Sequence, residues 1–244
     1  MLTLIYNYYV MSKLKLFQTG TLKNLMLGDF NGSICVSEIL KNGNLGIGTY
    51  DSFDGEAIFL NGHAYNGRAD GKVYEMKSTD TCPFCQVASF DDSVIKKSIY
   101  FDSIGTLTTK LMNEIDSRNH FYAIKMQGIF NVTYRSCFKV EKPFKPLAIV
   151  AKEQKIFVKE QIEGTVVGIY SPEFSDGMSL PGWHLHFIDK DLLTGGHILK
   201  LQSEKCDYQI NKINEWLINF SESDEFKTND LLIDLKEATK IVEG

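Results

Sequence analysis

Short runs rich in β-branched and aromatic residues recur along this chain, and runs of this kind predict β-strands. Strands are expected at residues 14–17, 57–60, 73–76, 121–132, 134–140, 165–170, 183–188 and 197–202. Between the early strands lie Asn-Gly or Asp-Gly pairs at 54–55, 61–62, 66–67 and 70–71, which supply the positive φ angles that tight hairpins require. The first half of the chain therefore predicts an antiparallel meander.

Helical periodicity is limited to a few segments. Apolar residues recur every three or four positions between 104 and 115, which predicts an amphipathic helix over residues 103–118. Shorter helices are expected at 21–26, at 37–40 and, near the C-terminus, at 211–220.

These elements predict an α/β protein of the α+β type, in which two β-rich halves contain mixed or antiparallel sheets and a few helices. The stiff segment KPFKP at 142–146 is unsuited to a sheet interior and marks the expected boundary. We expect an N-terminal β-rich domain over 13–145 and a C-terminal β domain with a terminal tail over 146–244. Residues 1–12 lack the charged leader of a signal peptide and are expected to form a disordered extension.

Composition narrows the class of protein. The 244 residues include 26 Lys and Arg against 31 Asp and Glu, a formal net charge of −5, whereas a nucleic-acid-binding chain needs a basic surface. No apolar run approaches the ~18–20 residues of a transmembrane helix, so no membrane partner is expected. The five cysteines are odd in number and irregularly spaced, which favours free thiols and a reducing, cytoplasmic location.

One pair of cysteines has a spacing that also occurs in redox motifs and in structural zinc sites. Cys82-Pro-Phe-Cys85 is a CxxC motif, but a redox motif requires a helix after the first cysteine, and a strand is expected here. A structural zinc site requires a second pair of ligands, and the chain has no second CxxC. We interpret the spacing as coincidence and the cysteines as small buried apolar residues.

The segment Gly182-Trp-His-Leu-His-Phe, followed by Gly195-Gly-His, is more informative. Residues two apart on a strand point to the same face, so His184 and His186 are expected side by side. The intervening stretch is long enough to form a hairpin that brings His197 opposite them. Three imidazoles with an open fourth position are typical of a catalytic Zn²⁺ site.

The alternative interpretation is that these are ordinary strand histidines, each bonded to a backbone carbonyl. For His63, after an Asn-Gly turn, and His120, at a helix–strand junction, that interpretation is preferred, because neither has a partner at ligand spacing.

Two charged residues are weaker candidates. Glu56 directly follows an Asp-Gly turn, which could direct its carboxylate into a cleft for proton transfer, although an exposed hairpin carboxylate has the same pattern. Arg135 lies within an apolar, strand-forming run, where it could bind a substrate carboxylate in bidentate fashion or simply pair with an acidic side chain.

Taken together, these segments resemble the bacterial acetolactate decarboxylases, from about Phe17 to the C-terminus. The resemblance rests on LGIGTYDSFDGEAIFLNG (45–62), YAIKMQGIFNVTYRSCFKVEKPFKPL (122–147), EGTVVGIYSPEF (163–174) and PGWHLHFIDKDLLTGGHIL (181–199). The last segment, with HxH and GGH at this spacing, is the most specific. Where this chain has CPFC, the family usually has Thr-Pro-Phe-Ala, which agrees with the interpretation of that motif as coincidence.

The resemblance implies roles for individual residues, a bound metal ion and an oligomeric state. His184, His186 and His197 would hold Zn²⁺ in a C-terminal metal-binding domain, with the site in the cleft between the halves. Glu56 would be an acid or base, Arg135 an anion contact and Thr49 a substrate contact. A glutamate near the C-terminus also reaches the site in the family; Glu243 matches best and Glu237 is the alternative. The family further implies a homodimer.

The implied reaction is the decarboxylation of 2-acetolactate to acetoin in acetoin and butanediol biosynthesis. Its chemistry is compatible with these residues: Zn²⁺ would act as a Lewis acid, Arg135 would orient the leaving carboxylate, and Glu56 or the C-terminal glutamate would protonate one face. Two alternatives stay open. The same histidines could activate water in a metal-dependent hydrolase with Glu56 as base, or the chain could be a non-catalytic metal-binding β-protein.

Overall fold

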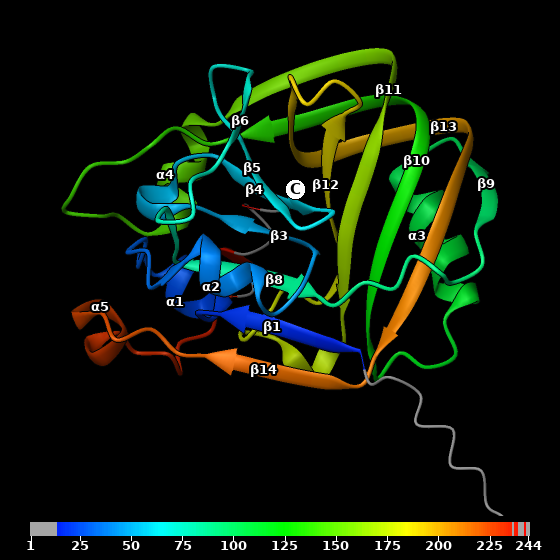
Figure 1. The fold of residues 1–244 in the computed structure, drawn as a ribbon. Helices are drawn as coiled ribbons and strands as arrows, with labels where there is room; N and C mark the ends of the chain where they lie inside the picture. Colours follow the sequence, from blue (N-terminus) through cyan, green and yellow to red (C-terminus); the bar gives the residue numbers. More distant parts are fainter. Residues whose placement is uncertain (1–13, 236, 239–241, 243–244) are drawn as a thin grey trace, which may run out of the picture.

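Two β-sheets pack against each other and form most of the protein, as seen in a computed structural model that describes residues 14–235, 237–238 and 242. In Figure 1 the first sheet occupies the left of the molecule, and the long strands of the second stand on the right. The prediction of a mixed-sheet protein with few helices is confirmed. The predicted extension over residues 1–12 lies outside the described residues.

The first sheet has seven strands and is mixed, because one pair of its strands is parallel. Its order is β14 (Glu215–Asn219), β1 (Lys15–Thr19), β8 (Phe84–Ala88), β3 (Leu45–Thr49), β4 (Glu56–Leu60), β5 (His63–Gly67) and β6 (Val73–Glu75). β1 and β14 are parallel, and the other neighbours are antiparallel. Asn61 and Gly62 both have positive φ angles, 53° and 79°, so the predicted Asn-Gly hairpin joins β4 to β5.

The second sheet is built mainly from long antiparallel strands, and it curves until most of its strands close into a ring. Its order is β10 (Phe121–Ser136), β11 (Lys155–Ser171), β12 (Gly182–Asp189), β13 (Gly195–Ile213) and β9 (Lys97–Phe101). β10 also pairs with β13, so β10 to β13 form a closed ring of strands. A short ladder, β2 (Ile34–Cys35) with β7 (Thr81–Cys82), lies outside both sheets.

The helices are short and lie around the sheets (Figure 1). They are α1 (Leu22–Met26), α2 (Val36–Leu40), α3 (Ile104–Glu114), α4 (Leu147–Val150) and α5 (Asp224–Thr228), with 3-10 turns η1 (Asp51–Phe53), η2 (Ala151–Glu153) and η3 (Glu173–Ser175). α3 buries Leu107 and Leu111 in the core enclosed by the second sheet. It ends before the predicted residue 118, because Ile115 already has an extended backbone.

Apolar side chains from both sheets meet in one shared core. The first sheet contributes Leu16, Leu45, Ile47 and Ile58, and the second contributes Phe121, Val167, Ile169 and Ile188. Burial of each such side chain stabilises the fold by ~1.5–3 kcal/mol. The packing of the two sheets is therefore a major source of stability, and it brings β4 against β12 and β5 against β13.

The predicted helix over residues 211–220 is wrong, because this segment consists of strands. Residues 211–213 end β13, and after Asn214 the chain continues as β14, alongside β1 at the other end of the chain. The backbone N–H of Asn214 donates to the carbonyl of Leu14 and starts this pairing. The long-range pairing with β1 decides the conformation of this segment, and the spacing of its apolar residues does not reveal that pairing.

Other predicted boundaries changed for a similar reason. The two strands predicted at 121–132 and 134–140 merge into the single strand β10, whose register shifts between Phe130 and Val132. β10 ends at Ser136, so the predicted strand is wrong over residues 137–140. β11 and β13 extend well beyond the predicted 165–170 and 197–202. Each long strand is supported by pairing along its length, which no local pattern indicates.

The two sheets do not follow the boundary predicted at residues 145 and 146. The first sheet takes β14 from beyond that point, and the second takes β9 and β10 from before it. The division into domains 13–145 and 146–244 stays a prediction.

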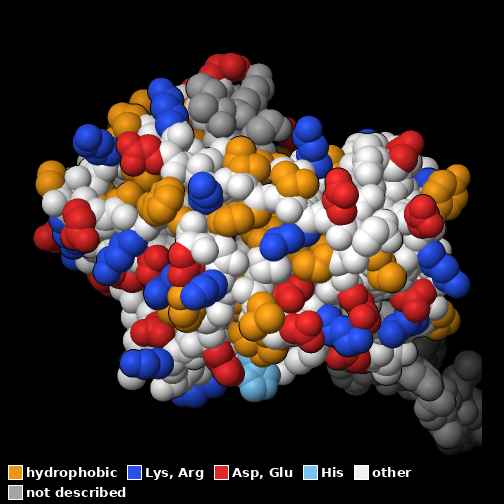
Figure 2. Space-filling model, turned by 90° about the horizontal axis from the view of Figure 1, so that it is seen from above, with side chains coloured by type: hydrophobic (Ala, Val, Ile, Leu, Met, Phe, Trp, Pro, Cys, Tyr) orange, Lys and Arg blue, Asp and Glu red, His pale blue; other side chains and the backbone are white. Residues whose placement is uncertain are grey.

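The surface carries charges of both signs. On the face shown in Figure 2, Lys and Arg side chains alternate with Asp and Glu, and apolar side chains lie between them. None of the helices formed by the described residues has the length and apolarity needed to cross a membrane.

Gly67 provides a test of the contact between the sheets. A Cβ at Gly67 would lie 2.3 Å from the carbonyl oxygen of Gly195 on the other sheet, and both groups are backbone. We expect Gly67→Ala to lower the free energy of unfolding by about 1–3 kcal/mol, measured by urea denaturation.

Gly105→Ala is the matched control, because a Cβ there would have its nearest neighbour at 4.0 Å, in a helix where alanine is favoured. Equal stabilities for the two variants would show that the sheets are not in close contact at Gly67.

Candidate active site

Three histidines converge on one face of the second sheet. His184 and His186 are two residues apart on β12 and therefore point to the same side. His197 on β13 pairs directly with His186, and opposed residues in an antiparallel pair share a face. The predicted hairpin that brings His197 opposite the HxH pair is confirmed.

The hairpin between β12 and β13 is held by its own backbone and by Asp189. The Asp189 carboxylate accepts hydrogen bonds from the backbone N–H groups of Leu193, at 2.7 Å, and Thr194, at 2.6 Å. Gly195 and Gly196 then allow close approach, since a Cβ on Gly196 would lie 2.4 Å from the carbonyl oxygen of Arg135. The two glycines before His197 thus let three strands meet closely at the site.

The imidazole rings lie at ligand-like distances from one another. His184 Nε2 is 2.9 Å from His197 Nδ1, and the ring centroids are 4.8–5.4 Å apart. One nitrogen from each of the three rings lies within 4.8 Å of the others. This arrangement could hold one metal ion with three nitrogen ligands.

His186 has the hydrogen bonding that is typical of a metal-binding histidine, in which a protein group holds one ring nitrogen and the other nitrogen is available for the metal. Its Nδ1 donates to the carbonyl oxygen of Ala57 on β4, at 2.9 Å, which places the lone pair on Nε2. Nε2 is buried and has no hydrogen-bond partner among the described residues. A buried nitrogen with an available lone pair, beside two further imidazoles, fits a divalent metal ion.

Burial keeps the three rings neutral. Burial, and then the positive charge of Arg135, lower the pKa of His184 to about 3. Burial is also the main reason that the pKa values of His186 and His197 lie well below the usual range. Because the neutral imidazole is the form that binds a metal, the cluster is ready to act as a ligand set near neutral pH.

Glu56 reaches the histidines from the first sheet. It is the first residue of β4 and only 5% exposed, and its Oε2 lies 3.6 Å from His186 Nε2. The preceding turn is unusual, since Ser52 and Phe53 have positive φ angles of 61° and 55°. Such conformations persist only where the surroundings support them, and here they aim the Glu56 carboxylate into the site.

Arg135 lies beside both Glu56 and His197. It pairs with His197 across β10 and β13, which places both side chains on one face. Its Nη1 is 3.5 Å from Glu56 Oε1. One carboxylate oxygen of Glu56 therefore faces the guanidinium, and the other faces His186.

Cys137 also belongs to this group, although its sequence context predicted only a small buried apolar residue. Its thiol accepts from Arg135 Nη1, at 3.5 Å, and donates to Glu56 Oε1, at 3.8 Å. The available signal was position, because Cys137 is two residues beyond Arg135 in the strand predicted at 134–140, and such residues share a face.

Thr49 is opposite Glu56 in the β3–β4 pair, and its hydroxyl donates to the carbonyl of Gly55 at 2.8 Å. A small cavity of about 30 Å³, the space of one water molecule, lies beside these groups. Polar residues in its lining are Thr49, Glu56, Arg135, His184 and His197. Apolar residues in its lining are Leu22, Leu25, Phe53, Phe84, Leu147 and Val242.

The other residues singled out in the sequence have different positions. Glu237 is exposed, and Glu243 lies outside the described residues. His63 pairs with Glu75 on the surface, at 2.8 Å. Cys85 lies on β8, so a strand rather than a helix follows Cys82, and burial raises the pKa of the Cys82 thiol well above its usual range.

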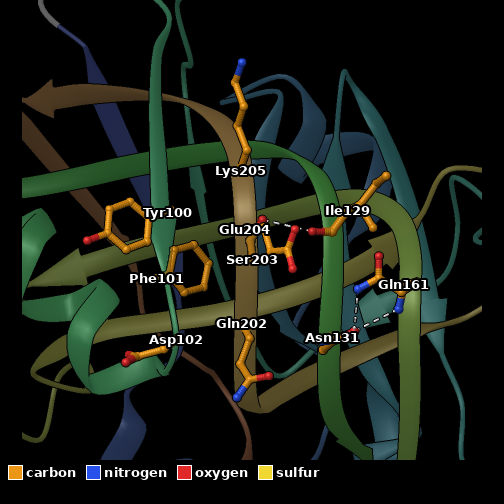
Figure 3. A pocket seen from close by; sticks show the side chains of 10 residues that line it. All are labelled: Tyr100, Phe101, Asp102, Ile129, Asn131, Gln161, Gln202, Ser203, Glu204 and Lys205. Carbon is orange, nitrogen blue, oxygen red and sulfur yellow. Dashed lines mark hydrogen bonds between the residues drawn. The ribbon is translucent and has the colours of Figure 1, made fainter.

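A larger cavity, of about 450 Å³, lies elsewhere, between β9, β13 and the point where the pairing of β10 with β11 shifts register (Figure 3). Its lining includes Tyr100, Asn131, Gln161 and Gln202, and Gln161 bonds to Asn131 rather than facing the cavity unpaired. None of the predicted site residues lines it, so its size does not make it a competing active site.

Comparison with known proteins agrees with this geometry. Residues 16–232 match the family model described as alpha-acetolactate decarboxylase. The chain belongs to the alpha-acetolactate decarboxylase family. The resemblance predicted from the HxH and GGH segment is therefore confirmed.

Individual relatives support the same conclusion. The alpha-acetolactate decarboxylase of Bacillus licheniformis is 34% identical over 94% of this chain and 92% of its own length. That of Lactococcus lactis subsp. cremoris is 34% identical over 94% of this chain and 98% of its own length. The crystal structure of the Bacillus subtilis enzyme superposes with a TM-score of 0.91 at 30% identity, covering 94% of this chain and 99% of that one.

The site geometry predicts which histidines bind metal. We expect His186→Ala and His197→Ala each to lose the metal ion, because the two imidazoles that remain are too few to hold it. Metal per chain would be measured by elemental analysis after dialysis. His63→Ala, which removes a surface histidine, is the control and should keep its metal. Full metal content in both site variants would rule out this ligand set.

Proposed function

We propose that this chain is a metal-dependent acetolactate decarboxylase that converts 2-acetolactate to acetoin and CO₂, with Zn²⁺ held by His184, His186 and His197. The observation that carries the proposal is the convergence of three neutral imidazoles beside Glu56 and Arg135. A small cavity at this point is lined by Glu56, Arg135 and two of the imidazoles, those of His184 and His197. Zn²⁺ is proposed because three nitrogen ligands with an open position suit it, and when bound it would supply Lewis-acid stabilisation of negative charge on the substrate oxygens.

The substrate carboxylate is proposed to bind Arg135. The guanidinium is buried, and a buried guanidinium can hold a carboxylate in a fixed, bidentate orientation. In the reaction the bond between C2 and the carboxylate breaks, CO₂ leaves, and its bonding electrons move into the neighbouring ketone to give an enediolate. The orientation set by Arg135 would align that bond with the ketone π system.

Glu56 is proposed to deliver the proton that completes the reaction. Its carboxyl group would protonate C2 of the enediolate from one face, which yields one enantiomer of acetoin. Thr49 would contact the substrate through its hydroxyl. The apolar lining, including Phe53 and Leu147, would exclude water that could protonate the other face.

The resemblance to the family supports further proposals. Glu243, or Glu237, would add a second carboxyl group to the site. The active form would be a homodimer located in the cytoplasm, and the reaction would serve acetoin and butanediol biosynthesis.

The activity can be tested with purified protein loaded with Zn²⁺ and given racemic 2-acetolactate. We expect acetoin and CO₂ in equal amounts, with one enantiomer of the substrate consumed first. If protein with a full metal content produced no acetoin, the result would contradict the proposal. Hydrolysis of an activated ester instead would favour the hydrolase alternative, and bound metal without turnover would favour a binding protein.

The role of Glu56 can be tested by Glu56→Gln, which keeps the shape but removes the transferable proton. We expect kcat to fall by about 10²–10⁴, the usual contribution of a general acid, with metal content retained. Glu163→Gln is the control, because Glu163 pairs with Lys190 on the surface. An unchanged kcat in Glu56→Gln would show that another group protonates the enediolate.

A further inference from the structure

Asp29 is a buried carboxylate that the proposed chemistry does not use. It lies just after α1 and is 3% exposed. Its Oδ2 accepts from Asn24 Nδ2, at 2.5 Å, and from the hydroxyls of Ser223, at 2.5 Å, and Ser221, at 3.4 Å. Its Oδ1 accepts from the backbone N–H of Asn31, at 3.2 Å, and from Asn31 Nδ2, at 2.7 Å. Asp29 thus connects three segments of the chain.

One of these segments is the chain after β14. Ser223 is the N-cap of α5, and Asn31 Nδ2 also donates to Glu225 on that helix, at 2.9 Å. Asn229 Nδ2 donates to Asn24 Oδ1, at 2.9 Å. These hydrogen bonds hold residues 221–229 against α1, where Figure 1 shows both helices at the lower left. α1 in turn supplies Leu22 and Leu25 to the lining of the active-site cavity.

The residues next to Asp29 hold the turn that precedes Glu56. Phe30 is fully buried, and its ring stacks on Phe53 with centroids 4.9 Å apart. The carbonyl oxygen of Phe30 accepts from the backbone N–H of Ser52, at 2.8 Å. The backbone N–H of Gly32 donates to Asp51, at 2.7 Å. The positive φ angles of Ser52 and Phe53 therefore depend on support from residues 30–32.

We propose that Asp29 is a positioning residue for the active site. By holding α1, α5 and residues 30–32 together, its carboxylate keeps the turn at 51–53 in the conformation that directs Glu56 toward His186. It touches neither the substrate nor the metal ligands. The effect on turnover rests on the proposed decarboxylase function, whereas the effect on the turn does not.

Asp29→Asn is the informative variant, because its shape is unchanged. Its amide nitrogen would face the amide nitrogen of Asn24, so that two donors meet and one hydrogen bond is left unmade. We expect the Ser52 amide to exchange with deuterium faster by on the order of tenfold, which corresponds to one buried hydrogen bond left unmade. We also expect kcat for acetoin formation to fall by a comparable factor, with full metal content and a smaller change in KM.

The double variant Asn24→Asp/Asp29→Asn provides a rescue. It exchanges the amide and the carboxylate, so the new Asn side chain can donate to the new Asp side chain and still accept from Asn31. We expect both Ser52 protection and kcat to recover toward the original values. Glu222→Gln, an exposed change on the same tail, is the control and should leave both unchanged.

The outcomes separate this inference from the proposed function. Suppose that the unmodified protein makes no acetoin, but that Asp29→Asn speeds amide exchange at Ser52 and the double variant restores the slower exchange. The proposed decarboxylase function would then be wrong, whereas the proposal that Asp29 supports the turn at 51–53 would be correct. If the unmodified protein is active and Asp29→Asn retains its kcat, the inference is overturned, whether or not thermal stability falls. Failure of the double variant to recover would overturn it as well, since the contact with Asn24 would then not explain the loss.

Discussion

The candidate active site depends on the register of three neighbouring strands. His186 opposes His197 across β12 and β13, and Arg135 opposes His197 across β10 and β13. In an antiparallel sheet a slip of one residue would turn every side chain of a strand to the opposite face. The histidines and the arginine share a face only in the observed register, and Gly195 and Gly196 allow the strands to approach closely enough to keep it.

The second sheet alone does not complete the site. Ala57 and Glu56, at the start of β4, come from the first sheet, and the bond from His186 Nδ1 to the Ala57 carbonyl joins the two across the core. The hydroxyl of Ser136 adds a second link by donating to the carbonyl of Gly67, at 2.6 Å. The same packing removes water, which makes the imidazoles neutral and leaves Arg135 as a buried cation. A buried cation is costly unless it is paired, and Glu56 is an acidic side chain that lies beside it among the described residues.

The parts of the fold that local pattern predicted well are those that local interactions decide. The hairpins at Asn61-Gly62 and between β12 and β13 follow from turn chemistry, and the helix around Leu107 and Leu111 follows from its apolar stripe. The predicted helix at 211–220 was wrong because β1, at the opposite end of the chain, supplies its pairing partner. The length of β10 and the role of Cys137 were missed for the same reason, since both depend on groups far away in sequence.

The chemical groups and their local geometry follow directly from the amino-acid sequence: two imidazoles side by side on one strand, a third after a glycine-rich turn, and a carboxylate after an Asp-Gly turn. These are consequences of strand periodicity and of turn residues, which act over a few positions. The tertiary structure brings Glu56 and Arg135 to the histidines and Cys137 to Glu56 and Arg135. The packing of the two sheets keeps the rings neutral, and contacts with residues 30–32 hold the turn before Glu56. Those features require the two sheets to pack and exclude water, and packing joins residues that no short stretch of sequence contains.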